Sequence, residues 1–213
     1  MNGPDRPPRV DIRTRRREKL IEDARAVALE LFLEQGYENT SIDEISAALG
    51  VSPRTLFRHV ETKDRFLHYI QADWSALILD AFQEQPDGTS LVEAYLLCVH
   101  MLADHLQDDP ERSRRIVMLI YSQSTNLSST WASYTSFADP RMSGEIARRL
   151  HLDAADAEVT IFRSMLTSCV VQALHEWASS ADTEPDLYTL MERNLRLMEG
   201  VEERIVKRSP ASS

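Results

Sequence analysis

Apolar residues recur every three to four positions along most of this chain, which is the spacing of one face of an α-helix. The first such run extends from about Thr14 to Gln35, and Gly36 follows it as a helix-ending residue. Its apolar positions are Leu20, Ile21, Ala24, Val27, Ala28, Leu31 and Phe32. The pattern predicts a long amphipathic helix near the N-terminus.

Two short helices separated by a tight turn are predicted next. Ser41 and Glu44 have the spacing of a capping box, in which each side chain satisfies a free backbone N–H. Gly50 ends this helix, and Ser52 caps the following one. Pro53 occupies the first helical position, where its missing N–H costs no hydrogen bond. With the second helix predicted from Pro53 to about Val60, the pair has the helix-turn-helix pattern.

The rest of the chain is also predicted to be helical, and strand patterns are nearly absent. The residues from 122 to 143 are rich in Ser and Thr and are expected to be irregular. One helix is predicted to begin near Thr62 and to continue through Leu77. Asp153 is expected to cap a long helix that runs to about Ser180. The other predicted helices are Ser90–Leu106, Glu111–Tyr121, Arg141–Leu150 and Pro185–Lys207. We therefore predict an all-α fold, with a flexible basic arm at 1–13, a helix-turn-helix domain at 14–71 and a larger helical domain at 72–213.

Several classes of protein are disfavoured by what the chain lacks. No apolar run approaches the roughly 18 residues of a membrane span, and the N-terminus has no signal-peptide core. Cys98 and Cys169 lie in separate apolar stretches, as expected of reduced residues in a cytoplasmic protein. We find no nucleophile elbow, zinc-protease motif or phosphate-binding glycine loop. The sequence predicts a protein that is not an enzyme, with no cofactor and no membrane partner.

One pair of residues leaves a metal or ligand site open. His100 and Asp104 are four residues apart on a predicted helix, which is a spacing that two metal ligands can have. Because no further ligand cluster accompanies them, a partly buried polar face is the favoured interpretation, and no metal is expected.

The net charge of −10 is unusual for a protein that binds nucleic acid, but its distribution is uneven. Residues 1–71 hold 12 Lys and Arg against 12 Asp and Glu, and residues 72–213 hold 12 against 22. Residues 1–19 alone carry seven basic and three acidic residues. DNA affinity depends on where cations meet phosphates rather than on the total charge. The first third of the chain is therefore the candidate for contact with DNA.

The exposed side of the second short helix supplies the candidate contacts. Its polar side chains suit phosphates and base edges in a major groove, although a solvated helix face is the plain alternative. The preceding arginines could follow a minor groove or phosphates, or form a solvated charge run. Lys63 is expected to meet a phosphate rather than a carboxylate, and Thr40 and Ser41 could cap a helix and also donate to phosphate. The predicted DNA-binding residues are Arg15, Arg16, Arg17, Thr40, Ser41, Ser52, Arg54, Thr55, Phe57, Arg58, His59 and Lys63.

At these residues the chain resembles a known family. The run Gly36-Tyr37, Thr40-Ser41-Ile42, Gly50-Val51-Ser52-Pro53-Arg54-Thr55-Leu56-Phe57-Arg58-His59 and Lys63-Asp64 is similar to the DNA-binding signature of the TetR/AcrR regulators. The resemblance covers about residues 18–67. Phe57 stands where the family usually has Tyr, which removes one hydrogen bond to DNA, and Val60 stands where it usually has Phe. Phe57 could instead turn inward and fill the space that Val60 leaves.

The resemblance implies a homodimer that binds palindromic operator DNA and releases it when a small-molecule effector binds the C-terminal domain. An activator or a helical interaction module without an effector is the alternative. In this family the last two long helices form the dimer interface, which places Val170, Leu174, Leu190 and Met198 there. The residues that could line an effector pocket, with ordinary core packing as the alternative, are His100, Asp104, Trp131, Phe137, Phe162, Met165 and Trp177.

Overall fold

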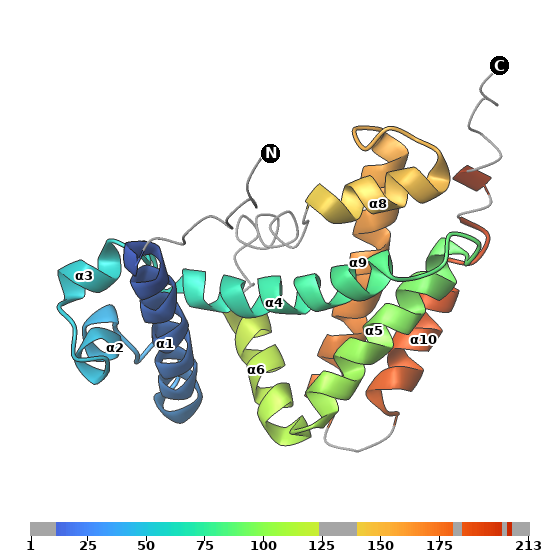
Figure 1. The fold of residues 1–213 in the computed structure, drawn as a ribbon. Coiled ribbons are helices and arrows are strands. Elements are labelled where there is room, and N and C mark those ends of the chain that lie inside the picture. Colours follow the sequence, from blue (N-terminus) through green and yellow to red (C-terminus); the bar gives the residue numbers. More distant parts are fainter. Residues whose placement is uncertain (1–11, 124–139, 181–184, 202–203, 206–213) are drawn as a thin grey trace, which may run out of the picture. The chain divides into compact units, whose positions relative to one another are not determined.

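The computed structural model describes residues 12–123, 140–180, 185–201 and 204–205. All regular secondary structure among these residues is helical, so the predicted all-α class is confirmed (Figure 1). The helices are α1 (Ile12–Gln35), α2 (Ile42–Ala48), α3 (Pro53–Phe57), α4 (Asp64–Gln83), α5 (Leu91–Gln107), α6 (Pro110–Gln123), α8 (Pro140–Leu150), α9 (Ala157–Ser179) and α10 (Leu187–Arg196).

The chain divides into two compact units, and the division lies inside α4. Unit 1 comprises Met1–Tyr69 and unit 2 comprises Ile70–Ser213. Helix α4 therefore begins in unit 1 and ends in unit 2. The sequence pattern placed the division close to this point, after residue 71.

Unit 1 has a small core that the short helices share with α1. Phe32 of α1 packs its ring against Tyr37, with centroids 5.0 Å apart, and against Phe66 of α4, at 6.4 Å. The other buried side chains come from every helix of the unit and include Ala24, Ala28, Ile45, Leu56, Val60 and Leu67. Burial of these apolar groups, rather than helix propensity, stabilises helices as short as α2 and α3.

Unit 2 is built around α5 and α9. Helix α9 packs against α6, α8 and α10, and α10 also packs against α5. The largest fully buried side chains of this unit are Leu79, Phe82, Leu91, Leu102, Leu106, Ile146, Leu150, Phe162 and Leu166. Every helical segment predicted for unit 2 contains a described helix. Across the two units, three predicted helix ends are wrong.

The first wrong end is that of α3, which stops at Phe57 rather than at Val60. Arg58 is its C-cap, and the N–H of Val60 donates to the carbonyl of Leu56 at 2.9 Å. The chain therefore leaves the helix in a turn while Val60 still reaches the core.

The second wrong end is the start of α9, because the N-cap of this helix is Asp156 rather than Asp153. The Asp153 carboxylate instead accepts from the N–H of Ala155 at 2.8 Å, and that of Asp156 accepts from the N–H of Asp153 at 3.0 Å. These bonds form a turn before the helix, so Asp153 is not its cap.

The third is the end of α10, which lies at Arg196 instead of Lys207. Turns follow from residue 197, and Gly200 has a φ of +79°, in the left-handed region that interrupts a helix. Helical residues resume at Val201.

No helix in the described part of the chain combines the length and the apolar character needed to cross a lipid bilayer.

Candidate nucleic-acid interface

The turn between α2 and α3 sets the geometry of this surface. The Ser41 hydroxyl accepts from the N–H of Glu44 at 3.2 Å, and the Glu44 carboxylate accepts from the N–H of Ser41 at 2.8 Å, which completes the predicted capping box. Gly50, with a φ of +67°, turns the chain after α2. The N–H of Val51 donates to the carbonyl of Ser46 at 3.0 Å and closes the turn.

Helix α3 begins as the sequence predicts. The Ser52 hydroxyl accepts from the N–H of Thr55 at 3.2 Å, and Pro53 occupies the first turn. Leu56 and Val60 are fully buried on its inner side. These two anchors hold a helix that is too short to be stable in isolation, so its outer face has a defined orientation within unit 1.

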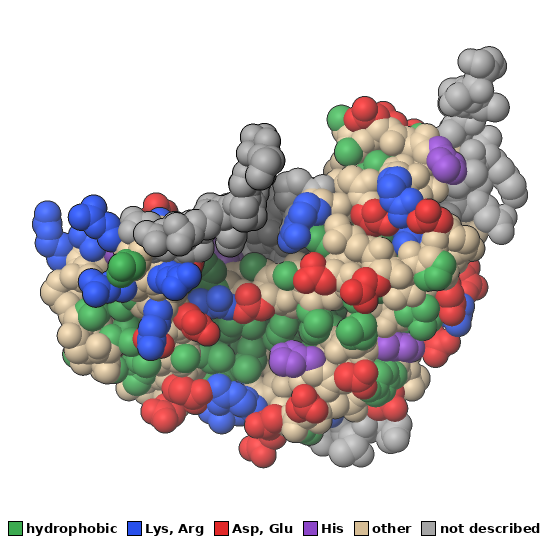
Figure 2. Space-filling model, in the orientation of Figure 1, with side chains coloured by type: hydrophobic (Ala, Val, Ile, Leu, Met, Phe, Trp, Pro, Cys, Tyr) green, Lys and Arg blue, Asp and Glu red, His purple; other side chains and the backbone are tan. Residues whose placement is uncertain are grey.

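The outer face of α3 is basic and partly aromatic. Arg54 and Arg58 are exposed, and Thr55 is half-buried. Phe57 has 49% of its surface exposed, whereas Val60 has none. The inward placement of Phe57 is therefore wrong, because the space beneath α3 is filled without it. Figure 2 shows Lys and Arg side chains gathered over the part of unit 1 that Figure 1 labels α3 and the start of α1.

His59 lies between two arginines at the end of this face. The Nη2 of Arg58 is 3.3 Å from the Nε2 of His59. A guanidinium has no acceptor, so Arg58 must donate and Nε2 must carry the lone pair, with the ring neutral. Desolvation, the charge of Arg58 and the charge of Arg17 on α1 all lower the pKa of His59. This end of the surface is therefore a cluster of three basic side chains.

Helix α1 begins slightly earlier than predicted, so Arg13, which was expected in the flexible arm, is helical. Arg15, Arg16 and Arg17 are helical as predicted, and all four arginines are exposed in the first turns of α1. An extended arm in a minor groove is therefore not formed by these four residues. Their contact with phosphates stays a prediction, and residues 1–11 lie outside the described part of the chain.

Lys63 and Thr40 have internal roles that the sequence pattern did not show. The Lys63 ammonium donates to the carbonyls of Tyr37 at 2.6 Å and Thr40 at 3.0 Å, and lies 4.0 Å from the centroid of the Tyr37 ring. Thr40 is 2% exposed, and its hydroxyl donates to the carbonyl of Gly36 at 2.9 Å. We therefore correct the Thr40 assignment, because its proton is already used inside the protein. Lys63 clamps the loop before α2, with at most one N–H left for a phosphate.

The same loop is held by a second contact. The Tyr37 hydroxyl donates to the Asp64 carboxylate at the start of α4. Burial and this hydrogen bond raise the pKa of Tyr37. Together the Tyr37 and Lys63 contacts fix the position of α2, and hence of α3, within unit 1.

Two of the predicted effector-binding residues lie in the core of unit 2. Phe162 is fully buried and Trp177 is 3% exposed, with the guanidinium of Arg114 at 5.0 Å from the Trp177 ring. Met165 is 38% exposed. Trp131 and Phe137 lie outside the described residues. Effector contact by this set stays a prediction.

His100 and Asp104 both face α10. The His100 ring meets the Tyr188 ring edge-on, with centroids 5.3 Å apart, and the Tyr188 hydroxyl donates to the Asp104 carboxylate. No third metal-binding side chain joins them among the described residues. The arrangement fits the polar face that the sequence favoured.

The four residues predicted for the dimer interface are buried within the subunit. Val170, Leu174, Leu190 and Met198 are between 1% and 6% exposed, because they form part of the core between α9, α10 and their neighbours. The exposed apolar residues on these elements are Ile161, Met165 and Leu197, at 58%, 38% and 76%. Ile161 and Met165 are four residues apart and share one face of α9. The sequence did not single out this face, because apolar residues cover much of the surface of the helix.

Comparison with known sequences identifies the N-terminal region. Residues 25–70 match the sequence model of the bacterial regulatory proteins of the tetR family. The HTH-type transcriptional regulator TcmR of Streptomyces glaucescens is 28% identical to this chain, and the alignment covers 86% of this chain and 81% of TcmR. Both matches include the surface built on α3.

Solved structures share the fold over most of the chain. The TetR-family repressor FadR of Thermus thermophilus, solved in complex with lauroyl-CoA, superposes with a TM-score of 0.62 at 21% identity and covers 90% of this chain and 98% of its own. A tetR-family transcriptional regulator from Streptomyces coelicolor gives a TM-score of 0.57 at 16% identity, covering 90% and 88% of the two chains. At these identities the similarity establishes the architecture of both units.

Proposed function

Because the chain belongs to the TetR family of transcriptional regulators, we propose that it is a homodimeric cytoplasmic repressor that a small molecule releases from its operator. The family places a DNA-binding domain in unit 1 and consists of regulators rather than enzymes.

The observation that carries the proposal is the outer face of α3. Arg54 is exposed on α3 and Arg58 at its C-cap, and the buried Leu56 and Val60 anchor the helix from below. Arginine is suited to this role because its planar guanidinium can donate two hydrogen bonds to a guanine edge or to a phosphate. A rigid helix with outward arginines can enter a major groove without first becoming ordered.

The charge distribution supports the same assignment. The acidic excess lies in residues 72–213, and the first 71 residues are balanced. Phosphates attract the arginines of α1 and α3, and the acidic remainder of the chain is repelled by them. Binding to DNA through unit 1 is therefore electrostatically favoured over binding through unit 2.

A homodimer is needed for a palindromic operator, since each subunit supplies one recognition helix. Ile161 and Met165 provide an exposed apolar face on α9. We assign this face to the dimer contact in place of the residues that proved to be buried. Such a face is costly to leave in water and is complemented by its own copy across a twofold axis.

Control by a small molecule requires that the effector bind one state of the dimer better than the other. The structural relative from Thermus thermophilus was solved with lauroyl-CoA. A small-molecule complex of this relative supports a small-molecule effector for the present chain, and we place the effector site in unit 2. Displacement of helices in unit 2 would change the spacing of the two recognition helices and weaken operator binding.

The proposal is tested by selecting DNA that the full-length protein binds from a random pool. We expect the enriched sequences to have twofold symmetry, with half-sites about one helical turn apart. A double variant, Arg54→Ala with Arg58→Ala, should enrich no shared sequence. Failure of the native protein to enrich any sequence would reject operator binding and favour a helical interaction module.

A further inference from the structure

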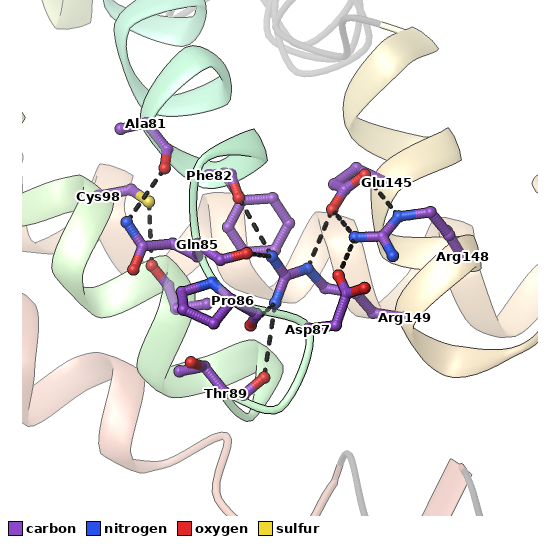
Figure 3. A network of polar contacts seen from close by, with 11 residues as sticks. Ala81, Phe82, Gln85, Pro86, Asp87, Thr89, Cys98, Glu145, Arg148 and Arg149 are labelled. Atoms are coloured by element: carbon purple, nitrogen blue, oxygen red, sulfur yellow. Dashed lines mark hydrogen bonds and ion pairs between the residues drawn. The ribbon is translucent and has the colours of Figure 1, made fainter.

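A single buried arginine joins α8 to the end of α4. The Arg149 side chain is 3% exposed. Its Nη2 donates to the carbonyls of Phe82 at 3.2 Å and Gln85 at 2.7 Å, and its Nη1 donates to that of Pro86 at 3.2 Å (Figure 3). The guanidinium also lies 4.7 Å from the centroid of the Phe82 ring and pairs with Glu145 at 3.0 Å.

The contact adds a charged donor to carbonyls at the end of α4 and in the loop that follows it. The Phe82 carbonyl also accepts from the N–H of Gln85 at 3.2 Å and the Pro86 carbonyl from the N–H of Thr89 at 3.1 Å, and a carbonyl oxygen can accept two hydrogen bonds. A cation at this position also complements the negative end of the helix dipole. The rigid fork of arginine can reach several carbonyls at once, which the single ammonium of lysine cannot. Arg149 therefore acts as a C-terminal cap for α4 that is supplied by another helix.

The neighbouring arginine shows what an ordinary ion pair looks like here. Arg148 is 48% exposed and pairs with Asp87 at 2.8 Å and with Glu145 at 2.5 Å. Its contacts are to carboxylates rather than to the backbone carbonyls at the end of α4 that Arg149 binds. Exposed pairs of this kind contribute little to stability, so Arg148 provides a matched control for Arg149.

We propose that Arg149 is a positioning residue that fixes the C-terminal end of α4 to α8 and so sets the orientation of the helix that continues into the DNA-binding unit. This inference rests on the proposed function. Helix α4 is the element shared by the two units, since it begins at Asp64 and ends at Gln83. Any shift of α8, including one that an effector causes, reaches α4 directly through this contact.

The physical consequence concerns preorganisation. With the anchor intact, the end of α4 has one preferred position against α8. Without it, the end of α4 samples several orientations, and operator binding must select among them. Weakening the anchor should therefore lower operator affinity even though no DNA-contacting residue has changed.

The experiment uses the full-length protein and the operator selected from the random pool. The variants are Arg149→Met, Arg149→Lys, Glu145→Gln and the control Arg148→Met. Operator affinity is measured by fluorescence anisotropy, and amide hydrogen exchange is followed by mass spectrometry over peptides that cover residues 70–90 and residues 12–60. Light scattering at the assay concentration verifies the oligomeric state of each variant.

We expect Arg149→Met to speed exchange in residues 84–90, to leave exchange in residues 12–60 unchanged and to lower operator affinity about tenfold. For Arg149→Lys and Glu145→Gln, both the exchange rate and the operator affinity should lie between those of Arg149→Met and the native protein. Across the series, variants with faster exchange in residues 84–90 should bind the operator more weakly. Arg148→Met should change neither quantity more than about twofold.

Two results would separate the inference from the proposed function. If the native protein binds the operator and the variants loosen residues 84–90 without losing affinity, Arg149 does not position α4 for DNA binding. The graded Arg149→Lys and Glu145→Gln variants decide this even if Arg149→Met fails to fold. If the native protein selects no operator, the proposed function itself fails.

Discussion

Single side chains decide which polar groups of unit 1 are available to DNA. Arg54, Arg58 and Phe57 are on the outside of α3, as their spacing predicts. Thr40 and Lys63 have equally suitable chemistry, but their hydrogen bonds are used inside the unit. A sequence shows the residue type and the helical face, whereas the partners of a polar side chain depend on loops that fold back from elsewhere.

Phe57→Tyr tests the exposed placement of this residue. The new hydroxyl would lie beside Arg58, where it can donate to a phosphate oxygen, and a hydrogen bond to a charged group contributes about 1.5–3 kcal/mol at most. We expect a modest gain in operator affinity with an unchanged melting temperature, measured by anisotropy and by thermal unfolding of the same sample. A lower melting temperature with unchanged affinity would show that the ring is buried.

His59 gives operator binding a pH dependence. In the free protein its pKa is lowered, by desolvation first and then by Arg58 and Arg17. A bound phosphate would neutralise these charges and raise the pKa, so DNA binding takes up a proton. Affinity should therefore rise as the pH falls through the pKa of the bound state, and level off below that of the free state. Each pKa unit between the two states corresponds to about a tenfold change.

His59→Gln should flatten this pH profile, which is measured at constant ionic strength. His105→Gln, an exposed substitution on α5 of unit 2, should retain the native profile. Identical profiles for native protein and His59→Gln would show that His59 does not exchange a proton on binding.

Whole helices followed from the apolar spacing, but their ends did not. The boundaries of α3 and α9 depend on Arg58 and on the turn between Asp153 and Asp156, where several residues of suitable chemistry compete. The broad apolar stripe of α9 could not distinguish Val170, buried in the subunit, from Ile161, which is exposed. Periodicity identifies the apolar positions of a helix, whereas the packing of the helices determines which of these positions are buried inside the subunit and which are exposed.

The end of α8 provides a stability test. His151 follows the helix with a φ of +57°, in the left-handed region that costs a residue with a Cβ about 1 kcal/mol. The N–H of Leu152 donates to the carbonyl of Ala147 at 2.9 Å, so the turn is a closed C-cap in which glycine is preferred. His151→Gly should raise the free energy of unfolding by about 0.5–1 kcal/mol.

The control is His105→Gly within α5, where the same replacement should lower the free energy of unfolding by a similar amount. Both are measured by chemical denaturation at one fixed protein concentration, because a dimer unfolds with concentration dependence. A less stable His151→Gly variant would contradict the proposed strain.

At the scale of the whole molecule, function depends on two copies acting together. We expect twice the chain mass of 24.3 kDa in light scattering at micromolar concentration. Ile161→Asp should raise the dissociation constant of the dimer about thirtyfold or more, because it places a carboxylate in the apolar contact. Leu97→Asp, at a comparably exposed position on α5, is the control and should leave the dimer intact. A native protein of one chain mass, or an unaffected Ile161→Asp, would contradict this interface.

The central claim, that α3 reads operator DNA, is tested most directly by comparing the affinities of the native protein and Arg54→Ala for the selected operator and for random DNA at one salt concentration. The native protein should prefer the operator by about a thousandfold or more. Arg54→Ala should lose about 1–3 kcal/mol on the operator and much less on random DNA, whereas Arg115→Ala in unit 2 should lose little on either. Equal binding of the native protein to both DNAs, or an Arg54→Ala variant that binds the operator as tightly as the native protein, would contradict the account.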